Sequence, residues 1–587
     1  MQTHYRTHLS QDISESLIGT EIRLSGWAHR VRDLGQVAFI DLRDHSGLFQ
    51  IVLENDLLAQ APHLRQIRQE YVISVTGTVR LRSTPNPELH NGQLELCAQE
   101  VQIINAALTP PIPIHDHNQA DELSRMKYRY LDLRRPEQAK FLLLRHRVSQ
   151  AIRGYLNGLA FLEIETPYLT KSTPEGARDY VVPSRVHPGK FFALPQSPQL
   201  FKQLLMMSGM DRYYQIVRCF RDEDLRSDRQ PEFTQVDIEA SFVTRDSIIQ
   251  MVTGLMGAAF TAAGKQFPEK IPHMAYAEAY TRYGTDRPDL RYDLSFHRLD
   301  AIFAESSFQV FTQILAQNGT ILGFKVPQKA SSFTRKFTDT MLTGISSLGF
   351  KGVAVGHWRE GTLHAPFAKF LSSEQVDLLQ KNLDLTEDDS VVILAHTHQS
   401  TLYTAMDLLR RKLAETLSLY TQEDAFVWIV DFPMFAEEDN GTLAAVHHPF
   451  TSPHPEDLEM LRTTPAQARA QAYDIVWNGV EIGGGSIRIH DSHLQSQIFG
   501  LLGLSENEIS EKFGFFVDAL QYGTPPHGGI ALGLDRLIMM LAGTSSIRDV
   551  IAFPKTAQAQ CPLSEAPSIL SKNQLNELKI RLDIPHE

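Results

Sequence analysis

The stretch from Arg218 to Glu239, RCFRDEDLRSDRQPEFTQVDIE, constrains this chain more than any other. It follows an apolar run, and from Phe233 onward its residues alternate between two faces, as the residues of a β-strand do. The middle is too charged for burial and contains Pro231, so it predicts a loop. We therefore expect a strand–loop–strand unit. Four of its side chains are expected around one sheet surface: Arg221, Glu223, Phe233 and Asp237.

The chemistry of this unit is compatible with two interpretations. A planar, permanently charged guanidinium such as that of Arg221 suits a phosphate, and an exposed ring such as Phe233 can stack on a base. The same residues also fit a salt-bridged surface hairpin that binds nothing. The residues alone leave both interpretations open.

Three segments resemble the signature motifs of one enzyme family. Phe220–Arg226 together with Arg229–Glu239 resembles the second motif of class II aminoacyl-tRNA synthetases, in the form found in bacterial aspartyl-tRNA synthetases. Gly529–Leu541 (GIALGLDRLIMML) is similar to the third motif, and Leu159–Pro167 (LAFLEIETP) to the first. The segments stand in the order of that family, and the similarity extends over essentially the whole chain.

Composition limits the class of protein. The net charge of −13, from 56 Lys and Arg against 69 Asp and Glu, excludes a uniformly basic nucleic-acid coat but allows a local basic groove. The three cysteines lack the spacing of a zinc site or a disulfide framework. The first residues form no secretory signal, and no apolar run reaches the roughly 18–20 residues of a membrane span. We expect a cytoplasmic protein without membrane contact.

We expect an α+β multidomain fold: an N-terminal OB-fold β-barrel, a class II synthetase catalytic domain on an antiparallel sheet, and an inserted α/β domain. A helix at Leu57–Glu70 is predicted among the barrel strands, which are Ile22–Trp27, Val37–Leu42, Leu48–Leu53, Tyr71–Val79 and Leu94–Ile104. The predicted boundaries are 1–107 for the barrel, 108–136 for a proline-rich linker, 137–287 for the first catalytic part, 288–418 for the insertion, and 419–587 for the second catalytic part with a C-terminal extension.

Side chains on the barrel strands suggest contact with a single-stranded nucleic acid. Phe39 can stack on a splayed base and Gln50 can bond to it, although Phe39 in the core and arginines on a solvated face fit equally well. The resemblance implies that the barrel reads the tRNA anticodon. The candidate contacts are Arg32, Leu34, Phe39, Gln50 and Arg82.

Apolar residues recur every three or four positions from Glu137 to about Asn157, which predicts a long helix, and a short strand is expected at Phe161–Glu165. The resemblance implies that this pair of elements forms a homodimer interface. An ordinary core helix is an equally good interpretation of the pattern itself.

The resemblance also implies the roles of the site residues. Catalysis is assigned to Arg221 and Arg536, which act on ATP, with Arg221 also on the amino acid. Aspartate is expected to contact Glu175, Ser197, Gln199, Lys202, Arg221, Asp237, His447 and Arg488. ATP is expected to contact Arg221, Asp222, Glu223, Gln230, Phe233, Glu481, Gly533, Leu534, Asp535 and Arg536.

Asp474 and Glu481 flank an Asn-Gly turn and are the candidate magnesium ligands, since Mg²⁺ prefers oxygen ligands and is usually shared with phosphates and water. The adjacent His447 and His448 are a poor metal pair, because no further ligand stands at a suitable spacing. The chain contains no GxxxxGK loop and no Rossmann fingerprint, which excludes a P-loop NTPase.

The implied reaction is the ATP-dependent activation of L-aspartate to aspartyl-adenylate, followed by transfer to the terminal adenosine of tRNA-Asp. A relaxed enzyme that also charges tRNA-Asn is an alternative, and so is a lysyl or asparaginyl enzyme. A tRNA-binding paralogue without ligase activity is a third. Leu34 favours tRNA-Asp, because relaxed members of the family often carry His in the corresponding turn.

Overall fold

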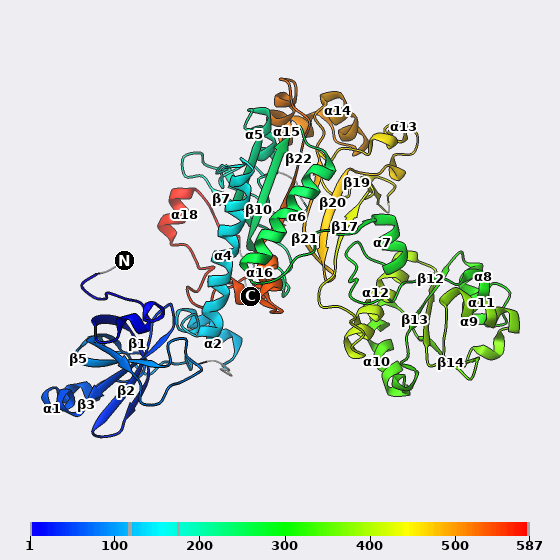
Figure 1. The fold of residues 1–587 in the computed structure, drawn as a ribbon. Helices are drawn as coiled ribbons and strands as arrows, with labels where there is room; N and C mark the ends of the chain where they lie inside the picture. The colour runs from blue at the N-terminus through cyan, green and yellow to red at the C-terminus, as the bar shows by residue number, and fades with distance from the viewer. Residues whose placement is uncertain (1–2, 116–119, 173–175, 439, 584–587) are drawn as a thin grey trace. The chain divides into compact units, whose positions relative to one another are not determined.

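The computed structural model describes residues 3–115, 120–172, 176–438 and 440–583. Figure 1 draws the chain coloured from its N-terminus to its C-terminus. By their contacts, these residues group into two compact units. One unit contains 1–147, 224–231 and 538–575, and the other contains 148–223, 232–537 and 576–587. Glu175, an expected aspartate contact, lies outside the described residues. The first unit therefore joins the N-terminal domain to a short loop and a C-terminal segment that are remote from it in sequence.

The N-terminal domain is a closed five-stranded barrel in the order β1-β2-β3-β5-β4, as expected. Its strands are β1 (Glu21–Asp33), β2 (Val37–Arg43), β3 (Leu48–Glu54), β4 (Val72–Leu81) and β5 (Leu94–Asn105). The single helix expected at 57–70 was wrong in extent: α1 (Asn55–Gln60) ends before Pro62, and a 3₁₀ turn (Pro62–Gln66) follows. Proline cannot donate the hydrogen bond that would continue the helix, but it is well suited to start the next turn.

The rest of the first unit consists of short elements. The segment after the barrel forms α2 (Glu122–Lys127) and α3 (Arg129–Asp132), and the long helix α4 (Pro136–Gly158) begins in this unit. The helix expected at 137–157 is thus confirmed. The C-terminal segment contributes α17 (Ile547–Val550) and α18 (Lys572–Leu578).

The second unit is built on an eight-stranded sheet in the order β11-β17-β20-β21-β22-β10-β9-β6. Its pairs are antiparallel except β11·β17 and β6·β9. The strands are β6 (Leu162–Glu163), β9 (Arg212–Phe220), β10 (Glu232–Ser241), β11 (His273–Ala275), β17 (Phe426–Val430), β20 (Ala472–Trp477), β21 (Val480–Ile487) and β22 (His527–Gly533). Register pairs Phe233 with Cys219, so β9 and β10 form the expected strand–loop–strand unit.

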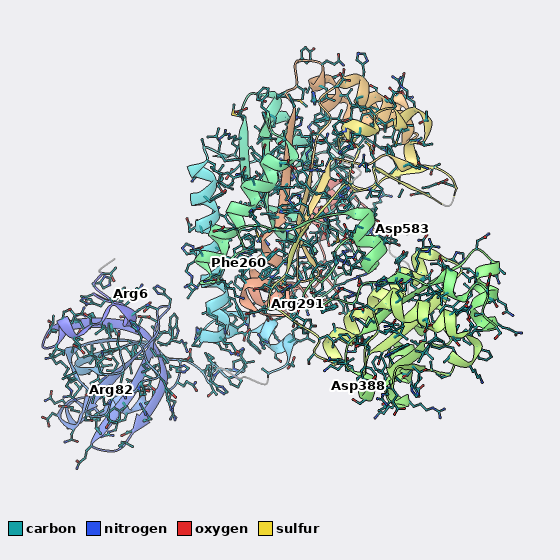
Figure 2. All side chains as sticks on the ribbon, turned by 45° about the vertical axis from the view of Figure 1, so that its right-hand side comes forward. Arg6, Arg82, Phe260, Arg291, Asp388 and Asp583 are labelled. Carbon is teal, nitrogen blue, oxygen red and sulfur yellow. The ribbon has the colours of Figure 1, made fainter. Side chains whose placement is uncertain are left out.

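Helices α5 (Gln199–Met207) and α6 (Arg245–Ala262) pack on this sheet, and α15 (Glu506–Leu520) packs on α5. Two further helices of the chain are α14 (Ser492–Leu501) and α16 (Leu534–Ala542). Phe260 of α6 packs on the sheet, where its ring centroid lies 5.6 Å from that of Phe426 and 4.8 Å from that of Trp477 (Figure 2). The sheet therefore joins segments that stand before and after residues 288–418 in the sequence.

Residues 288–418, the insertion, form a smaller sheet in the order β12-β13-β16-β14-β15. Its strands are β12 (His297–Arg298), β13 (Thr320–Val326), β14 (Ala354–Arg359), β15 (Thr362–His364) and β16 (Ser390–His396), and its longer helices are α9 (Gln309–Ala316), α10 (Arg335–Ile345), α11 (Ser373–Leu383) and α12 (Gln399–Thr416). Tyr403 of α12 contacts Tyr280 of α7 (Tyr276–Tyr283), with 4.8 Å between ring centroids. The insertion therefore packs on the part of the chain that precedes it.

None of the helices in the described ranges combines the length and the apolarity that a membrane span requires.

Arg410 of α12 is fully buried and ties this helix to the first residues of the insertion. Its guanidinium donates to the carbonyl oxygens of Asp289 (2.6 Å), Tyr292 (3.2 Å) and Leu294 (3.2 Å). It also lies over the rings of Tyr283 and Tyr292, at 4.6 and 4.4 Å from their centroids. Its loss would leave several buried carbonyl groups without a donor, which is costly.

We expect Arg410→Met to destabilise the second unit by about 3 kcal/mol, because the orphaned carbonyls lose their donor and the two rings lose their cation. Lys412→Met is the matched control on the same helix, since the Lys412 side chain is 60% exposed and pairs with Glu415, which is 68% exposed. Calorimetric unfolding should show a lower midpoint for Arg410→Met and an unchanged one for the control. Equal midpoints for both variants would contradict the structural role of Arg410.

Candidate active site

Two cations and two carboxylates form a fully buried cluster at the centre of the sheet. Lys202 Nζ lies 2.7 Å from Asp237 Oδ1 and 3.3 Å from Glu239 Oε2, and Arg488 Nε lies 2.9 Å from Glu239 Oε1. None of the four side chains is more than 2% exposed. Buried charges are tolerated only when paired, and each charge here has a partner of opposite sign.

The cluster joins three elements. Lys202 comes from α5, Asp237 and Glu239 from one face of β10, and Arg488 from the residue after β21. Glycine makes the room: a Cβ on Gly529 of β22 would lie 2.1 Å from Glu239 Oε2, and one on Gly485 of β21 would lie 2.0 Å from the Gly529 carbonyl oxygen. The glycine-rich sequences of β21 and β22 therefore let the strands approach around a buried carboxylate.

The two carboxylates of the cluster differ in their proton affinity. Burial alone would raise the pKa of Glu239, but the Arg488 and Lys202 cations lower it below the ordinary value. Burial raises the pKa of Asp237 even though Lys202 opposes this. Glu239 is thus the firmly ionised member, and it holds both cations in place.

Two buried polar atoms beside the cluster accept or donate no hydrogen bond within the described part of the chain: Asp237 Oδ2 and Gln199 Nε2. Such groups are rare in native proteins because they cost free energy unless a ligand or water satisfies them. Both belong to residues expected to contact the amino acid. A polar ligand that bonds to these atoms would remove that cost.

His448 was not among the expected site residues, yet its Nε2 lies 2.6 Å from Arg488 Nη1. Arg488 is the donor, so Nε2 accepts, and burial together with the Arg488 cation holds the pKa of His448 well below its usual range. The ring is therefore neutral. The expected residue, His447, packs edge-on against Phe432 with 4.8 Å between centroids, and burial and Arg488 lower its pKa to about 4.

The expected ATP side of the site lies on the second-motif strands. Arg221 follows β9, and its guanidinium carbon lies 5.0 Å from the ring centroid of Phe233 on β10. Arg536, at the start of α16, donates from Nη1 to the Glu481 carbonyl oxygen at 2.5 Å. Asp222 lies beside Arg178, with 3.7 Å between Oδ2 and Nε at an exposed position.

Asp474 and Glu481 stand on neighbouring strands β20 and β21, joined by the Asn478-Gly479 turn. Burial first, then the charges of Glu481 and Asp286, raise the pKa of Asp474 well above its ordinary value. A Cβ on Gly484 would lie 2.3 Å from Asp474 Oδ1, so glycine again makes room for a carboxylate. Two carboxylates that repel each other in a buried position fit a divalent cation, which would remove the repulsion.

The other expected residues have mixed environments. Asp535 is buried, and its Oδ2 accepts a 2.7 Å hydrogen bond from the Thr234 backbone nitrogen, which ties α16 to β10. Leu534 is buried, while Gly533 ends β22. Gln230 is 2% exposed, and its amide pairs with both backbone groups of Lys555, at 2.7 and 3.0 Å. Ser197 lies two residues before Gln199, the first residue of α5, which also carries Lys202.

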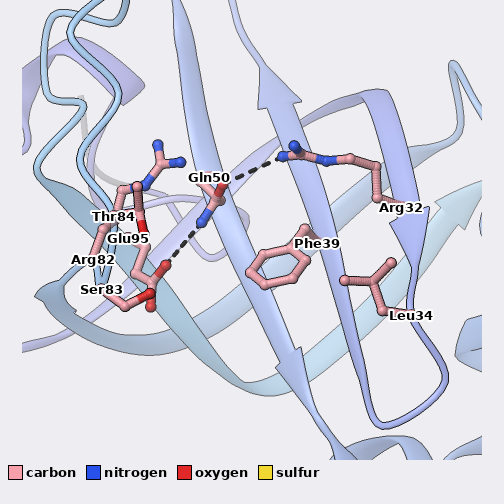
Figure 3. A pocket seen from close by; sticks show the side chains of 8 residues that line it. All are labelled: Arg32, Leu34, Phe39, Gln50, Arg82, Ser83, Thr84 and Glu95. Carbon is pink, nitrogen blue, oxygen red and sulfur yellow. Dashed lines mark hydrogen bonds between the residues drawn. The ribbon is translucent and has the colours of Figure 1, made fainter.

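On the barrel, a cavity of about 240 Å³ brings the five expected nucleic-acid contacts together (Figure 3). It is lined by Arg32, Leu34, Phe39, Gln50, Arg82, Ser83, Thr84 and Glu95. Gln50 Nε2 donates to Glu95 Oε2 at 2.8 Å, so its amide is held in one orientation. Glu95 was missed in the sequence analysis, although it stands opposite Arg80 in the pairing of β4 and β5.

Comparison with known proteins assigns the chain to a family. Residues 121–557 match the family described as tRNA synthetases class II (D, K and N), and residues 22–104 match the OB-fold nucleic acid binding domain. The first match covers more than half of the chain. The chain therefore belongs to the class II tRNA synthetases of the D, K and N group.

Curated relatives match over almost their whole length. A protein of Geobacillus sp. (strain WCH70) named Aspartate--tRNA(Asp/Asn) ligase is 48% identical over 581 residues, which cover 98% of this chain and 98% of the relative. A protein of Geobacillus kaustophilus (strain HTA426) named Aspartate--tRNA ligase is 47% identical over 586 residues, which cover 99% of each.

Solved structures share the fold. The asparaginyl-tRNA synthetase of Pyrococcus horikoshii complexed with asparaginyl-adenylate superimposes with a TM-score of 0.58 at 17% identity, covering 94% of this chain and 98% of that one. A putative aspartyl-tRNA synthetase from Leishmania major Friedlin gives a TM-score of 0.60 at 20% identity, with 96% and 95% covered.

We expect Arg488→Leu to abolish aspartate-dependent ATP–pyrophosphate exchange while ATP binding survives. The change removes one cation from a buried site and leaves Glu239 with Lys202 alone, a loss of about 3–5 kcal/mol, or roughly a hundredfold to several-thousandfold in kcat/KM. Steady-state exchange and a separate ATP titration measure the two effects.

Arg298→Leu is the control for this substitution, since the Arg298 side chain is 61% exposed on the insertion. It should behave as the parent protein does. If Arg488→Leu keeps aspartate exchange within about threefold of the parent, or loses mainly ATP affinity, Arg488 does not bind the amino acid side chain.

Proposed function

We propose that this protein is an aspartate–tRNA ligase, which activates L-aspartate with ATP and transfers it to the terminal adenosine of tRNA-Asp. The observation that carries the proposal is the buried pair of cations, Lys202 and Arg488, in the site of a D, K and N group synthetase. A carboxylate side chain fits beside them. The names of the two Geobacillus relatives agree with this choice.

The charges of the cluster select among the three amino acids of the group. A lysine side chain would bring a third cation against Lys202 and Arg488. An asparagine amide would direct its own donors at a guanidinium that has only donors. Aspartate would give the cations an acceptor, and its ammonium group would donate to Asp237 Oδ2, which accepts no hydrogen bond within the described residues. Ser197 and Gln199 are its further proposed contacts.

Adenylate formation needs no enzyme nucleophile, because the aspartate carboxylate attacks the α-phosphorus of ATP and pyrophosphate leaves. The protein then acts by positioning and by charge. Arg221 bridges the α-carboxylate and the α-phosphate, so that two negative groups can approach each other. Phe233 and Arg536 hold the adenine ring between them. This arrangement requires Arg221 to leave the face of Phe233, where it now lies.

Asp474 and Glu481 would hold Mg²⁺, and the ion would neutralise the charge of the ATP phosphates. Glu223, Gln230, Asp222 and the start of α16 complete the proposed ATP contacts. The amide of Gln230 is bonded to Lys555, so in this arrangement Gln230 supports the loop around ATP more than it contacts ATP.

The barrel cavity is the proposed anticodon site. Phe39 would stack on one base, and Gln50, held by Glu95, would present a fixed amide to it. Arg32 and Arg82 would contact the backbone, and Leu34, which is 70% exposed, lies where a neighbouring nucleotide passes. Relatives named for both tRNA-Asp and tRNA-Asn favour a relaxed enzyme as the second candidate.

A homodimer in the cytoplasm completes the proposal. Large apolar side chains are exposed on α4 and around β6, where the first-motif elements lie: Leu143, Leu159, Leu162 and Met210 are between 36% and 48% exposed. Such a surface is typical of an interface. Sedimentation equilibrium should give twice the mass of the 66.3 kDa chain, and a monomer mass would overturn this part.

ATP–pyrophosphate exchange with aspartate, asparagine and lysine tests the function directly. We expect exchange with aspartate at least about a hundredfold above that with either other amino acid, because only aspartate pairs with both cations. Exchange with none of the three would identify a paralogue without ligase activity. Exchange with asparagine or lysine at the level of aspartate would overturn the assignment of the cluster.

For tRNA selection, we expect tRNA-Asp transcripts to be charged faster than tRNA-Asn transcripts. The two anticodons differ in one base, and Leu34 supplies a shape contact on the order of 1 kcal/mol, or about fivefold. Initial rates with both transcripts at the same concentration measure this ratio. Equal rates would establish the relaxed enzyme instead.

A further inference from the structure

We propose that Arg129 is a positioning residue for the second-motif loop, residues 224–231, and that it acts through the C-terminal segment 547–555. This inference rests on the proposed function, since the loop connects Arg221 and Glu223 to Phe233. Arg129 lies in α3, far from the catalytic motifs in sequence. The three pieces belong to the same compact unit.

Arg129 is buried, with 4% of its side chain exposed, and its guanidinium binds the backbone of the C-terminal segment. Its Nη2 donates to the carbonyl oxygens of Arg548 (3.1 Å) and Ile551 (3.0 Å), and its Nε donates to that of Ala552 (3.0 Å). These carbonyls lie at and beyond the end of α17, where a helix leaves its acceptors without partners. One side chain therefore fixes the course of the chain from 548 to 552.

The same segment holds the second-motif loop at two points. The Ile547 backbone nitrogen donates to the Ser227 carbonyl oxygen at 3.1 Å. Eight residues on, Lys555 exchanges two hydrogen bonds with the amide of Gln230: its nitrogen donates to Oε1 at 2.7 Å, and its carbonyl accepts from Nε2 at 3.0 Å. The Arg129 contacts lie between these two points. Residues 547–555 are thus held in place by Arg129 and in turn bind the second-motif loop.

Asp132 fixes the orientation of Arg129. This carboxylate is fully buried and accepts from Arg129 Nη1 (2.7 Å), Arg135 Nη1 (2.9 Å) and Arg125 Nε (3.2 Å). Burial opposes its ionisation, but the arginines hold the pKa of Asp132 below its usual value. A planar guanidinium that is paired on one edge presents its other donors in a fixed direction. Lysine has a single nitrogen and cannot reproduce this.

A purely structural role would make the same contacts, so the test must follow the loop itself. We propose hydrogen exchange by mass spectrometry on the full-length protein, for the parent and for Arg129→Met, Arg129→Lys and Arg125→Met. Arg125→Met is the matched control. It removes an arginine from the same carboxylate together with a 3.9 Å ion pair to Asp549, whereas the carbonyls of 548–552 keep their donor. ATP–pyrophosphate exchange on the same samples gives KM for ATP and for aspartate.

In Arg129→Met we expect the amides of 547–556 and of 224–231 to exchange about tenfold faster, while those of the barrel strands are unchanged. KM for ATP should rise about fivefold or more, with KM for aspartate within twofold. Arg129→Lys keeps a cation beside Asp132 and should show the same pattern to a smaller extent, which provides the measurement if Arg129→Met does not fold. Arg125→Met should match the parent in loop exchange and in both KM values.

Faster exchange in 547–556 with no change in 224–231 would overturn the proposal, and so would an unchanged KM for ATP in a variant with a loosened loop. Equal effects in Arg125→Met would assign them to the ion pairs with Asp132 and Asp549, and not to the donors that Arg129 gives the carbonyls, and would equally overturn the proposal. Aspartate-dependent ATP–pyrophosphate exchange by the parent protein tests the proposed function independently of the Arg129 variants. If the parent shows no aspartate-dependent exchange, the function fails, while the amide data still decide whether Arg129 holds the loop.

Discussion

The buried pairing of Lys202 and Arg488 with Asp237 and Glu239 is the constraint on which the rest of the site depends. Each of these charges would be costly alone in the interior, so all four must be placed together for any of them to be tolerated. The cluster is therefore prepared before a ligand arrives. Glu239 contributes most to this preparation, since it is the only one of the two carboxylates that contacts both cations.

The sheet topology follows from this requirement. Strands β10, β21 and β22 are neighbours although residues 288–418 separate β10 from the other two in sequence. Strands this close together would leave no room for a buried carboxylate if every residue carried a side chain. Gly485 and Gly529 have none, and this provides the room. The glycine-rich sequences of β21 and β22 thus make room for the side chain of Glu239. In the same way, Gly484 on β21 leaves room for the carboxylate of Asp474 on the neighbouring strand β20.

The sequence and its resemblance predicted Lys202, Asp237 and Arg488, and the structure brings them together. Glu239 could have been predicted in the same way, because residues alternate between the two faces of β10 and Glu239 lies on the same face as Asp237. His448 was not, since nothing in two adjacent histidines on an irregular segment tells which one faces an arginine. Arg129 and Arg410 were also beyond prediction: their partners are backbone carbonyls, which every residue has, so no residue type marks the contact. The single helix expected at 57–70 was wrong in extent because Pro62 interrupts it after Gln60.

The insertion is connected to the site through backbone as well. Arg410 holds the carbonyl of Asp289, and the side chain of Asp289 in turn packs against Gly479, where an added Cβ would come within 3.0 Å of it. Gly479 lies in the turn that joins the strands of Asp474 and Glu481. A series of contacts therefore runs from α12 through Asp289 to the turn between β20 and β21. These contacts cross the domain boundary predicted at residue 288. Hydrogen bonds between Asn478 and residues 423–425 hold the same turn from another side. The position of both carboxylates therefore depends in part on α12, a helix that contains none of the expected site residues.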